Sequence, residues 1–218
     1  MSSISETNAQ VEAVQGGPGA AGSRPRVDDR ALDLLFREAR THTVWLPRPV
    51  PVGLLREVYD LAKMGPTSAN GTPARFAFLT TEEAKERLVP ALMPGNVEKT
   101  RTSPVVVLIA QDMAFHEQLP RLMPQFDARS YFAANPAVIA ETAIRNSSLQ
   151  GAYFMLAARS LGLDCGPMSG FDPEKVNAEF FAGGTWRVNF ICNLGYGDPS
   201  KTYPRNPRLG FEEACLVV

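Results

Sequence analysis

The stretch Pro104-Val-Val-Val-Leu-Ile-Ala110 (PVVVLIA) is an uninterrupted run of apolar side chains, most of them β-branched. β-Branched residues fit the pleated surface of a sheet. A run without polar alternation indicates a strand that is covered on both faces. We therefore predict a central strand over residues 104–110, with other parts of the chain packed above and below it.

Further strands and one long helix are predicted on either side of this run. ARFAFLT (74–80) and WRVNFICNLGYG (186–197) have the composition of strands. Residues 136–161 predict the longest helix, about 39 Å at 1.5 Å per residue. A short helix is expected over about 173–182, after a Gly-rich break. Because helices and strands do not alternate regularly, the pattern favours an α+β fold over a doubly wound sheet.

Two helices are predicted ahead of the first strand from their caps and apolar spacing. The first begins near Asp28, and its expected buried face is Leu32, Leu35, Phe36 and Ala39. The second covers about 54–64, and its expected buried face is Leu55, Val58, Tyr59 and Leu61. Gly65-Pro66 ends this second helix.

The sequence also predicts a capped helix and a long irregular segment. Thr80 and Glu83 are spaced as a capping box for a helix over 81–92. Residues 112–135 hold aromatic residues among prolines and charges, and they predict an irregular lid on the substrate side rather than core.

Composition excludes several classes of protein. The 218 residues carry a formal net charge of −1, which argues against a nucleic-acid or membrane partner. Three cysteines without a CxxC pair favour reduced thiols in the cytoplasm, and two distant histidines argue against a metal site. Residues 1–27, rich in Gly, Ala, Ser and Pro, predict a flexible tail ahead of one domain over 28–218.

Two basic segments could bind an anion. Arg40-Thr41-His42-Thr43 is either a basic helix end that favours the dipole or a corner of guanidinium, hydroxyl and imidazole donors. Lys201, Arg205 and Arg208 are either a solvated tail or a second phosphate clamp, stiffened by two prolines. The residues alone leave both alternatives open.

Three further segments are rich in small residues or polar groups. GPTSANGTPAR (65–75) is either a plain turn or a surface that brings backbone N–H groups close to a flat ligand. Pro94–Lys99 is either an exposed helix start or a segment that places Asn96 and Lys99 one helical turn apart. Gly166–Phe171 combines helix termination with a second Gly-Pro turn.

Taken in order, these motifs resemble the FMN-dependent nitroreductase family. The arginine-hydroxyl corner, P[ST]S.N..P before a strand, GN..K, GPM.GFD and a basic C-terminus occur between residue 30 and residue 218. One branch is especially similar, the malonic semialdehyde reductases (3-hydroxypropionate dehydrogenases) of the uracil-degradation Rut pathway. The stretches that carry this similarity are ARTHTVW, KMGPTSAN, DARSYF, ETAIRNSSLQ, LGLDCGPMSGFD and LGYGDPSK.

The resemblance implies a mostly antiparallel sheet flanked by helices, in an intertwined homodimer with FMN at the subunit interface. It implies phosphate or ribityl contacts by Arg40, His42, Arg205, Arg208 and, less directly, Lys201. Ser68 and Asn70 would contact the ring from the partner subunit, and Asn96 and Lys99 would face its polar edge. Pro167, Met168, Ser169 and Gly170 would lie along the ring.

The implied chemistry is ping-pong hydride transfer through flavin N5, from NADPH or NADH to a small aldehyde, nitro compound or quinone. Lys99 is expected to raise the flavin potential, because a cation near N1 and O2 stabilises the reduced form. Val44 stands where many relatives have a second basic residue, so a less oxidising flavin is expected. Ser169 stands where several carry glutamate, which puts their nicotinamide contacts in doubt.

A carboxylate-bearing aldehyde also needs a cation, and Arg129 is the expected clamp, with Arg75 or Arg145 as substitutes. The alternatives for Arg129 are a plain surface arginine and an intersubunit ion pair. Three alternatives to a semialdehyde reductase stay open at this point. They are a broad nitroreductase or quinone reductase, a non-catalytic flavin-binding protein, and an α+β domain without flavin.

Overall fold

Four antiparallel strands form the centre of the protein, in the order β1-β2-β4-β3. The computed structural model describes residues 25–218, so the tail predicted over 1–27 lies almost wholly outside the described residues. The strands are β1 (Ala74–Leu79), β2 (Val105–Asp112), β3 (Asp164–Met168) and β4 (Trp186–Gly195). The predicted α+β class and the predicted central strand are confirmed.

β2 is buried on both faces, as its sequence predicts. Every residue from Val105 to Ala110 is at most 2% exposed. Val105, Val107 and Ile109 pack into one apolar cluster, and the alternate residues of the strand pack into another. Each side chain buried in this way contributes about 1.5–3 kcal/mol. The sheet therefore needs a helical layer on each side.

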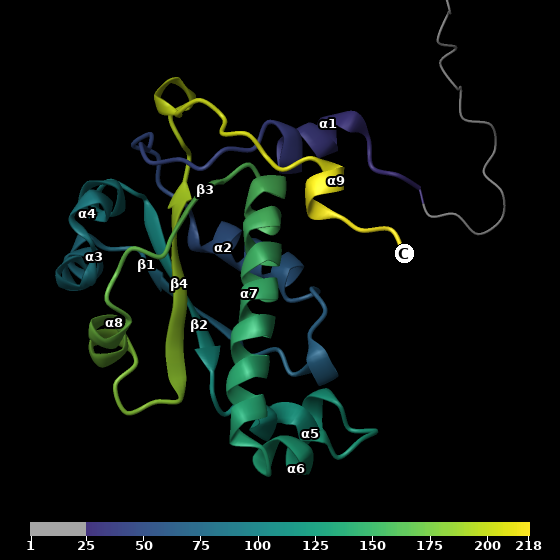
Figure 1. Ribbon diagram of the computed structural model, residues 1–218. Coiled ribbons are helices and arrows are strands. Elements are labelled where there is room, and N and C mark those ends of the chain that lie inside the picture. Colours follow the sequence, from purple (N-terminus) through teal and green to yellow (C-terminus); the bar gives the residue numbers. More distant parts are fainter. Residues whose placement is uncertain (1–24) are drawn as a thin grey trace, which may run out of the picture.

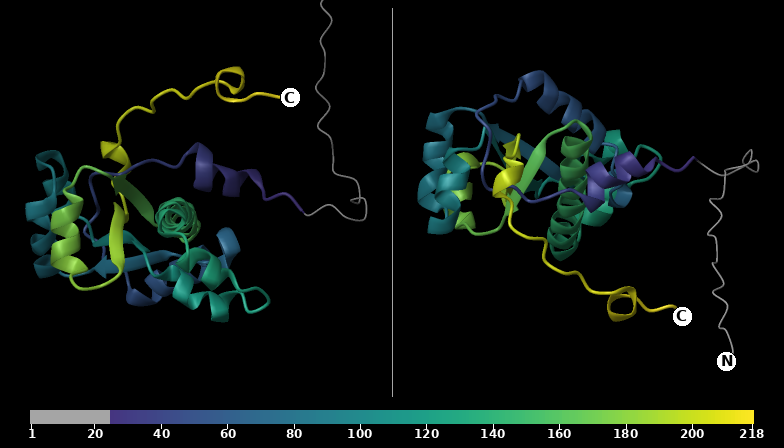
Figure 2. Two further views of the ribbon diagram at one scale, coloured as in Figure 1. Left: turned by 60° about the horizontal axis from the view of Figure 1, so that its bottom comes forward. Right: turned by 90° about the horizontal axis from the view of Figure 1, so that it is seen from above.

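Two sets of helices supply these layers, as the two views in Figure 2 show. α2 (Val52–Ala62) and the long α7 (Pro136–Ser160) pack on one face. α3 (Glu82–Leu88) and α8 (Pro173–Phe180) pack on the other face, with α4 (Pro94–Arg101) beside α3 (Figure 1). The lengths of α7 and α8 agree with the predicted helices.

Shorter helices lie around the two ends of α7 (Figure 1). Near its last turn is α1 (Asp29–Leu32), which continues as a π-helical turn over Asp33–Arg37. α9 (Phe211–Ala214) lies on the extended C-terminal segment, away from α7 in both views of Figure 2. Near the first turn of α7 are α5 (Leu119–Leu122) and α6 (Ala128–Ala133).

The segment 112–135 is not only the irregular lid that its composition predicts. Phe115, Leu119 and Phe132 are at most 4% exposed and form a third apolar cluster with residues of α6 and α7. Phe126 and Tyr131 stay exposed. The segment thus has its own small core, because its buried residues come from three short helical pieces whose spacing gives no single period.

The predicted buried faces of the two N-terminal helices need correction. In α2 the buried residues are Leu55, Val58 and Ala62, whereas Tyr59 and Leu61 are 45% and 48% exposed. At 100° per residue, residues 55, 58 and 62 lie within an arc of about 60°, whereas Tyr59 and Leu61 flank this arc on opposite sides. In the first helix no residue is buried, and Phe36 is 55% exposed.

Two local predictions are also wrong. α3 is capped by Thr81, whose hydroxyl accepts the Ala84 N–H at 3.1 Å, and not by Thr80. Residues 164–168, predicted to be a break, form the edge strand β3. Pro167 is compatible with this strand because, among residues 25–218, it pairs only with Cys192 of β4, and the bridge on the other side of β3 is made at Cys165.

The close packing of α7 on the sheet generates a stability prediction. A methyl group at Gly151 would lie 2.5–2.7 Å from the ring of Phe190, so Gly151→Ala should reduce the free energy of unfolding by about 1–3 kcal/mol. Chemical denaturation measures this loss. Gly53→Ala in α2 is the matched control, because no atom lies within 4 Å of its added methyl. The control should be neutral or stabilise by up to about 1 kcal/mol, and equal losses in both variants would contradict the packing argument.

Candidate functional site

An arginine-rich cavity of about 500 Å³ lies between residues 36–43, the C-terminal segment and the last turns of α7. Four arginines from three separate parts of the chain line it: Arg40, Arg159, Arg205 and Arg208. No aspartate or glutamate among residues 25–218 lines it. Guanidinium groups gathered without carboxylates are suited to binding a phosphate or a carboxylate.

Neutral oxygen atoms orient these arginines. Arg205 Nη2 donates to the backbone carbonyls of Arg37 at 2.7 Å and Ala39 at 2.9 Å. Arg40 donates to the carbonyl of Tyr203, so each of the two segments holds an arginine of the other. The structure therefore brings together the two basic segments that the sequence singled out. Because carbonyls carry no net charge, the guanidinium charges are left for a ligand.

His42 and Lys201 do not line this cavity, in contrast to their predicted role. Residues 41–43 run beside β3, and the His42 N–H donates to the Cys165 carbonyl at 3.1 Å. Side chains alternate along an extended segment, so Thr41 and Thr43 face the cavity while His42 faces inward. The His42 ring is 6% exposed and lies 3.4 Å from an Asp164 carboxylate oxygen. Lys201 is exposed in the short turn Pro199–Lys201.

A second group of predicted residues meets where α4 faces the end of β3. Asn96 Nδ2 donates to the Gly170 carbonyl at 2.7 Å, and the Met93 N–H donates to the same oxygen at 3.0 Å. A methyl group at residue 170 would lie 2.5 Å from Asn96 Nδ2, so this contact requires glycine. Pro167 and Met168 end β3, and Ser169 is exposed beside them. The structure thus brings Asn96 together with 167–170.

Lys99 lies on the same helix and carries an unpaired charge. Its backbone carbonyl accepts from Trp45 Nε1 and Asn193 Nδ2, both at 3.1 Å, which fixes the end of α4 to β4. Among residues 25–218 no carboxylate lies within 4.0 Å of its ammonium group. Partial burial lowers the pKa of Lys99. A half-buried ammonium without a counter-ion is poised to stabilise negative charge on a ligand.

The loop over 65–75 is held in shape by α7. Asn146 Oδ1 accepts the Ser68 N–H at 2.8 Å, and Gln150 Oε1 accepts the Ala74 N–H at 2.9 Å. Ala69, Asn70 and Thr72 have φ angles of 52°, 50° and 39°, a region that residues other than glycine rarely adopt. Backbone strain of this kind persists where the surroundings impose it, and it is frequent at binding sites.

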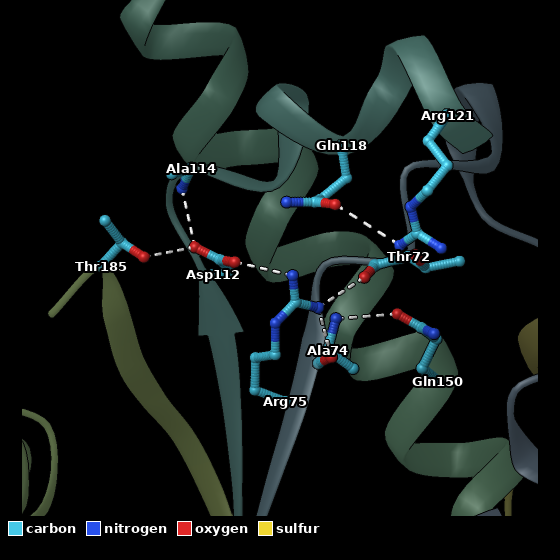
Figure 3. Close-up of polar contacts among 9 residues, drawn as sticks. All are labelled: Thr72, Ala74, Arg75, Asp112, Ala114, Gln118, Arg121, Gln150 and Thr185. Carbon is cyan, nitrogen blue, oxygen red and sulfur yellow. Dashed lines mark hydrogen bonds and ion pairs between the residues drawn. The ribbon is translucent and has the colours of Figure 1, made fainter. Parts of the chain in front are cut away.

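A larger cavity, of about 640 Å³, opens beside this loop. Its polar lining comes from the loop (Asn70 and Thr72), from β1, from the segment before α5, from α5 and from α7. Figure 3 shows five of these residues: Thr72, Arg75, Gln118, Arg121 and Gln150. Its apolar lining includes Tyr59, Phe76, Phe78 and Trp186. Asn70 Nδ2 donates to the Leu122 carbonyl at 2.8 Å, which ties the loop to α5.

The loop and the arginine-rich cavity lie far apart within one chain. The loop is bonded to α7 at Asn146, whereas the cavity is lined by Arg159 of the same helix. Thirteen residues of helix separate these two points by about 20 Å. One chain therefore does not bring Ser68 and Asn70 to the predicted phosphate cations.

The three candidates for a carboxylate clamp are all paired with acidic side chains. Arg129 makes two hydrogen bonds to the Glu117 carboxylate, at 2.7 and 3.2 Å, and it lowers the pKa of Glu117. Arg145 pairs with Glu141 on one face of α7. Arg75 pairs with the buried Asp112 at 2.7 Å. Arg129 thus forms a surface ion pair within its own chain, which argues against its predicted role as a clamp.

Two arginines that line the cavities were missed by the sequence analysis. Arg159 lies in the last turn of α7, where a basic residue is explained by the helix dipole alone. Arg121 lies in a segment without periodicity. Neither arginine belongs to a recognisable sequence motif. Only the folded structure shows that each of them lines a cavity.

Residues 25–218 contain neither a cluster of metal-binding side chains nor a membrane-spanning helix. Within that range no group of three or more His, Cys, Asp or Glu side chains is arranged to hold a metal ion. None of the helices in that range is long and apolar enough to cross a bilayer.

The sequence of this chain is similar to those of one protein family. The profile of the nitroreductase family matches residues 37–196. Two relatives are named "Putative NADH dehydrogenase/NAD(P)H nitroreductase". The one from Ralstonia nicotianae is 61% identical over 89% of this chain and all of its own length. The one from Burkholderia lata is 60% identical over 88% of this chain and 98% of its own length.

Solved structures have the same fold at low sequence identity. A nitroreductase-type protein from Bacillus subtilis superposes with a TM-score of 0.78 at 23% identity, over 87% of this chain and 99% of its own. A protein from Exiguobacterium sibiricum, solved in complex with FMN, also has a TM-score of 0.78, at 20% identity. It covers 89% of this chain and 99% of its own.

Proposed function

The chain belongs to the nitroreductase family, and from this premise we propose that it is an FMN-dependent NAD(P)H oxidoreductase that reduces malonic semialdehyde to 3-hydroxypropionate. The observation that carries the cofactor assignment is the arginine-rich cavity without carboxylates. FMN has a phosphate at one end and a flat ring at the other. The chain offers a separate group of residues suited to each end.

Arg40, Arg205 and Arg208 would bind the phosphate, together with Arg159 and the hydroxyls of Thr41 and Thr43. Guanidinium groups donate two parallel hydrogen bonds to phosphate, which makes them stronger partners than neutral donors. These arginines are already oriented by backbone carbonyls, so little side-chain entropy is lost on binding.

Asn96, Lys99 and residues 167–170 would lie along the ring. When bound, FMN supplies reversible hydride transfer between the nicotinamide and the acceptor. The half-buried Lys99 ammonium would stabilise the negative charge that reduction adds. The Asn96–Gly170 hydrogen bond fixes the wall against which the ring would lie.

We further propose a homodimer in which the loop 65–75 of one subunit completes the site of the other. The distance of about 20 Å between the loop and the arginine-rich cavity of one chain agrees with this arrangement, in which the arginines come from one subunit and Ser68 and Asn70 from the other. Exposed apolar residues offer surface for a partner. They lie on α7 (Ile144, Leu149 and Tyr153) and in the C-terminal segment (Leu209, Phe211, Leu216, Val217 and Val218).

The choice of acceptor is supported by the motifs shared with malonic semialdehyde reductases, such as DARSYF and LGLDCGPMSGFD. A second candidate is a broad nitroreductase or quinone reductase. It is favoured by the relative from Ralstonia nicotianae, which is 61% identical to this chain and is named as an NAD(P)H nitroreductase.

Turnover assays separate the two candidates. The purified protein should be yellow, and kcat/KM with NADPH or NADH should be higher for malonic semialdehyde than for a nitroaromatic compound. A flavin-loaded protein that prefers the nitroaromatic compound would shift the assignment to the second candidate. A protein that binds no flavin would overturn both.

Removal of one phosphate cation should weaken FMN binding. Arg205→Gln removes a charge-assisted contact, so we expect about a 10- to 100-fold higher Kd for FMN by equilibrium titration of the apoprotein. Arg187→Gln is the control, because this exposed arginine donates only to the carbonyls of Gly184 and Trp186, outside the cavity. The phosphate assignment is wrong if both variants bind FMN like the wild type.

Removal of the Lys99 charge should make the flavin harder to reduce. We expect Lys99→Met to lower the midpoint potential by about 30–60 mV, the two-electron equivalent of about 1.5–3 kcal/mol. Because burial lowers the pKa of Lys99, its ammonium loses its proton at a lower pH than an exposed lysine. The difference in potential should therefore shrink as the pH rises toward about 10. Lys175→Met on the surface of α8 is the control, and a similar change there would argue against a local effect.

A further inference from the structure

We propose that Arg121 binds the carboxylate of a short acidic substrate in the cavity beside the loop 65–75. This inference rests on the proposed function, because it names the part of the site that would select malonic semialdehyde over neutral acceptors. Arg121 would be a substrate-binding residue, in the role that the sequence analysis gave to Arg129.

Arg121 is the cation of this cavity that has no acidic partner among residues 25–218. Its side chain contacts only Gln118 Oε1, at the long distance of 3.4 Å (Figure 3). The other two cations in the lining are neutralised, since Arg75 pairs with Asp112 and Lys63 pairs with Asp60. No aspartate or glutamate of the described residues lines the cavity itself. The cavity therefore holds one uncompensated positive charge.

Arg75 has a different role in the same wall, that of a positioning residue. Asp112 accepts from Arg75 at 2.7 Å, from the Thr185 hydroxyl at 2.6 Å and from the Ala114 N–H at 2.9 Å. Arg75 Nη1 in turn donates to the carbonyls of Thr72 and Ala74, both at 2.9 Å (Figure 3). These bonds use three of the five guanidinium N–H donors, and the Asp112 carboxylate neutralises the charge, so Arg75 fixes the loop and offers no net charge to an anion.

The remaining lining suits a small acid with an apolar middle. Aromatic rings of Tyr59, Phe76, Phe78 and Trp186 line the cavity together with the amide side chains of Asn70, Gln118 and Gln150. A volume of about 640 Å³ is within the range of ligand sites and exceeds the needs of a three-carbon acid. Additional room is therefore left for the group that would deliver the hydride.

The cavity is joined to the loop that would face the flavin of the partner subunit. Asn70 lines the cavity, and its Nδ2 donates to the carbonyl of Leu122, the residue next to Arg121. Arg121 and Asn70 thus reach the same space from two elements that are bonded to each other. If Asn70 contacts the ring, Arg121 would stand in the same cavity as the acceptor.

The test compares an acidic aldehyde with a neutral one of the same length. Arg121→Gln should raise KM for malonic semialdehyde by about 10- to 100-fold and leave KM for propanal within about twofold. Arg121→Lys keeps the charge and should recover part of the loss. Arg129→Gln is the matched control, because Arg129 is an equally exposed arginine of the same segment that is paired with Glu117. Equal changes for both aldehydes, or a larger effect in Arg129→Gln, would overturn the proposal.

A second assay keeps this test independent of the physiological acceptor. Malonate should inhibit reduction of a neutral nitroaromatic compound competitively in the wild type, and Arg121→Gln should raise its Ki by about the same factor. This result would support the anion site even if the semialdehyde is not turned over, in which case only the proposed acceptor is wrong. A variant that instead raises KM for NADPH but not for NADH would assign Arg121 to the nucleotide phosphate and overturn the proposal.

Discussion

The burial of β2 on both faces is the constraint on which the rest of the structure depends. A strand with no polar face from Val105 to Ala110 is stable only when helices cover it from both sides. One layer, α7, brings Asn146 and Gln150 to the loop 65–75. The other layer is continued by α4, which carries Asn96 and Lys99. The candidate site is therefore assembled from the ends of elements whose positions the central strand determines.

The sequence predicted those parts of the fold whose buried residues follow one period. β2, β4, α7 and α8 were found because their patterns are long and uniform. β3 was missed because glycine and proline occupy a short strand whose ladder is with β4, and whose other edge makes a single bridge among the described residues, from Thr41 to Cys165. The small core of residues 115–132 was missed because it is built from separate turns, so its buried residues are neighbours only after folding.

The sequence motifs correctly indicated which basic segments lie together. They did not indicate which way a side chain faces or which arginines form ion pairs. Arg40 and Arg205 were identified together and line one cavity. His42 lies in the same motif, but strand alternation turns it inward. A sequence does not show which arginines are neutralised. Arg129 and Arg121 look alike in sequence, and only coordinates show that Glu117 binds the first.

The left-handed residues of the loop 65–75 have a consequence for assembly. Their conformation is imposed by α7 and by Arg75 of the same chain, so the loop has its shape before a second chain arrives. Ordering a flexible segment on association would consume part of the binding free energy. In the proposed homodimer, a subunit with a rigid loop would avoid that entropy loss, and most of the interaction energy of its surface would remain available to hold the two chains together.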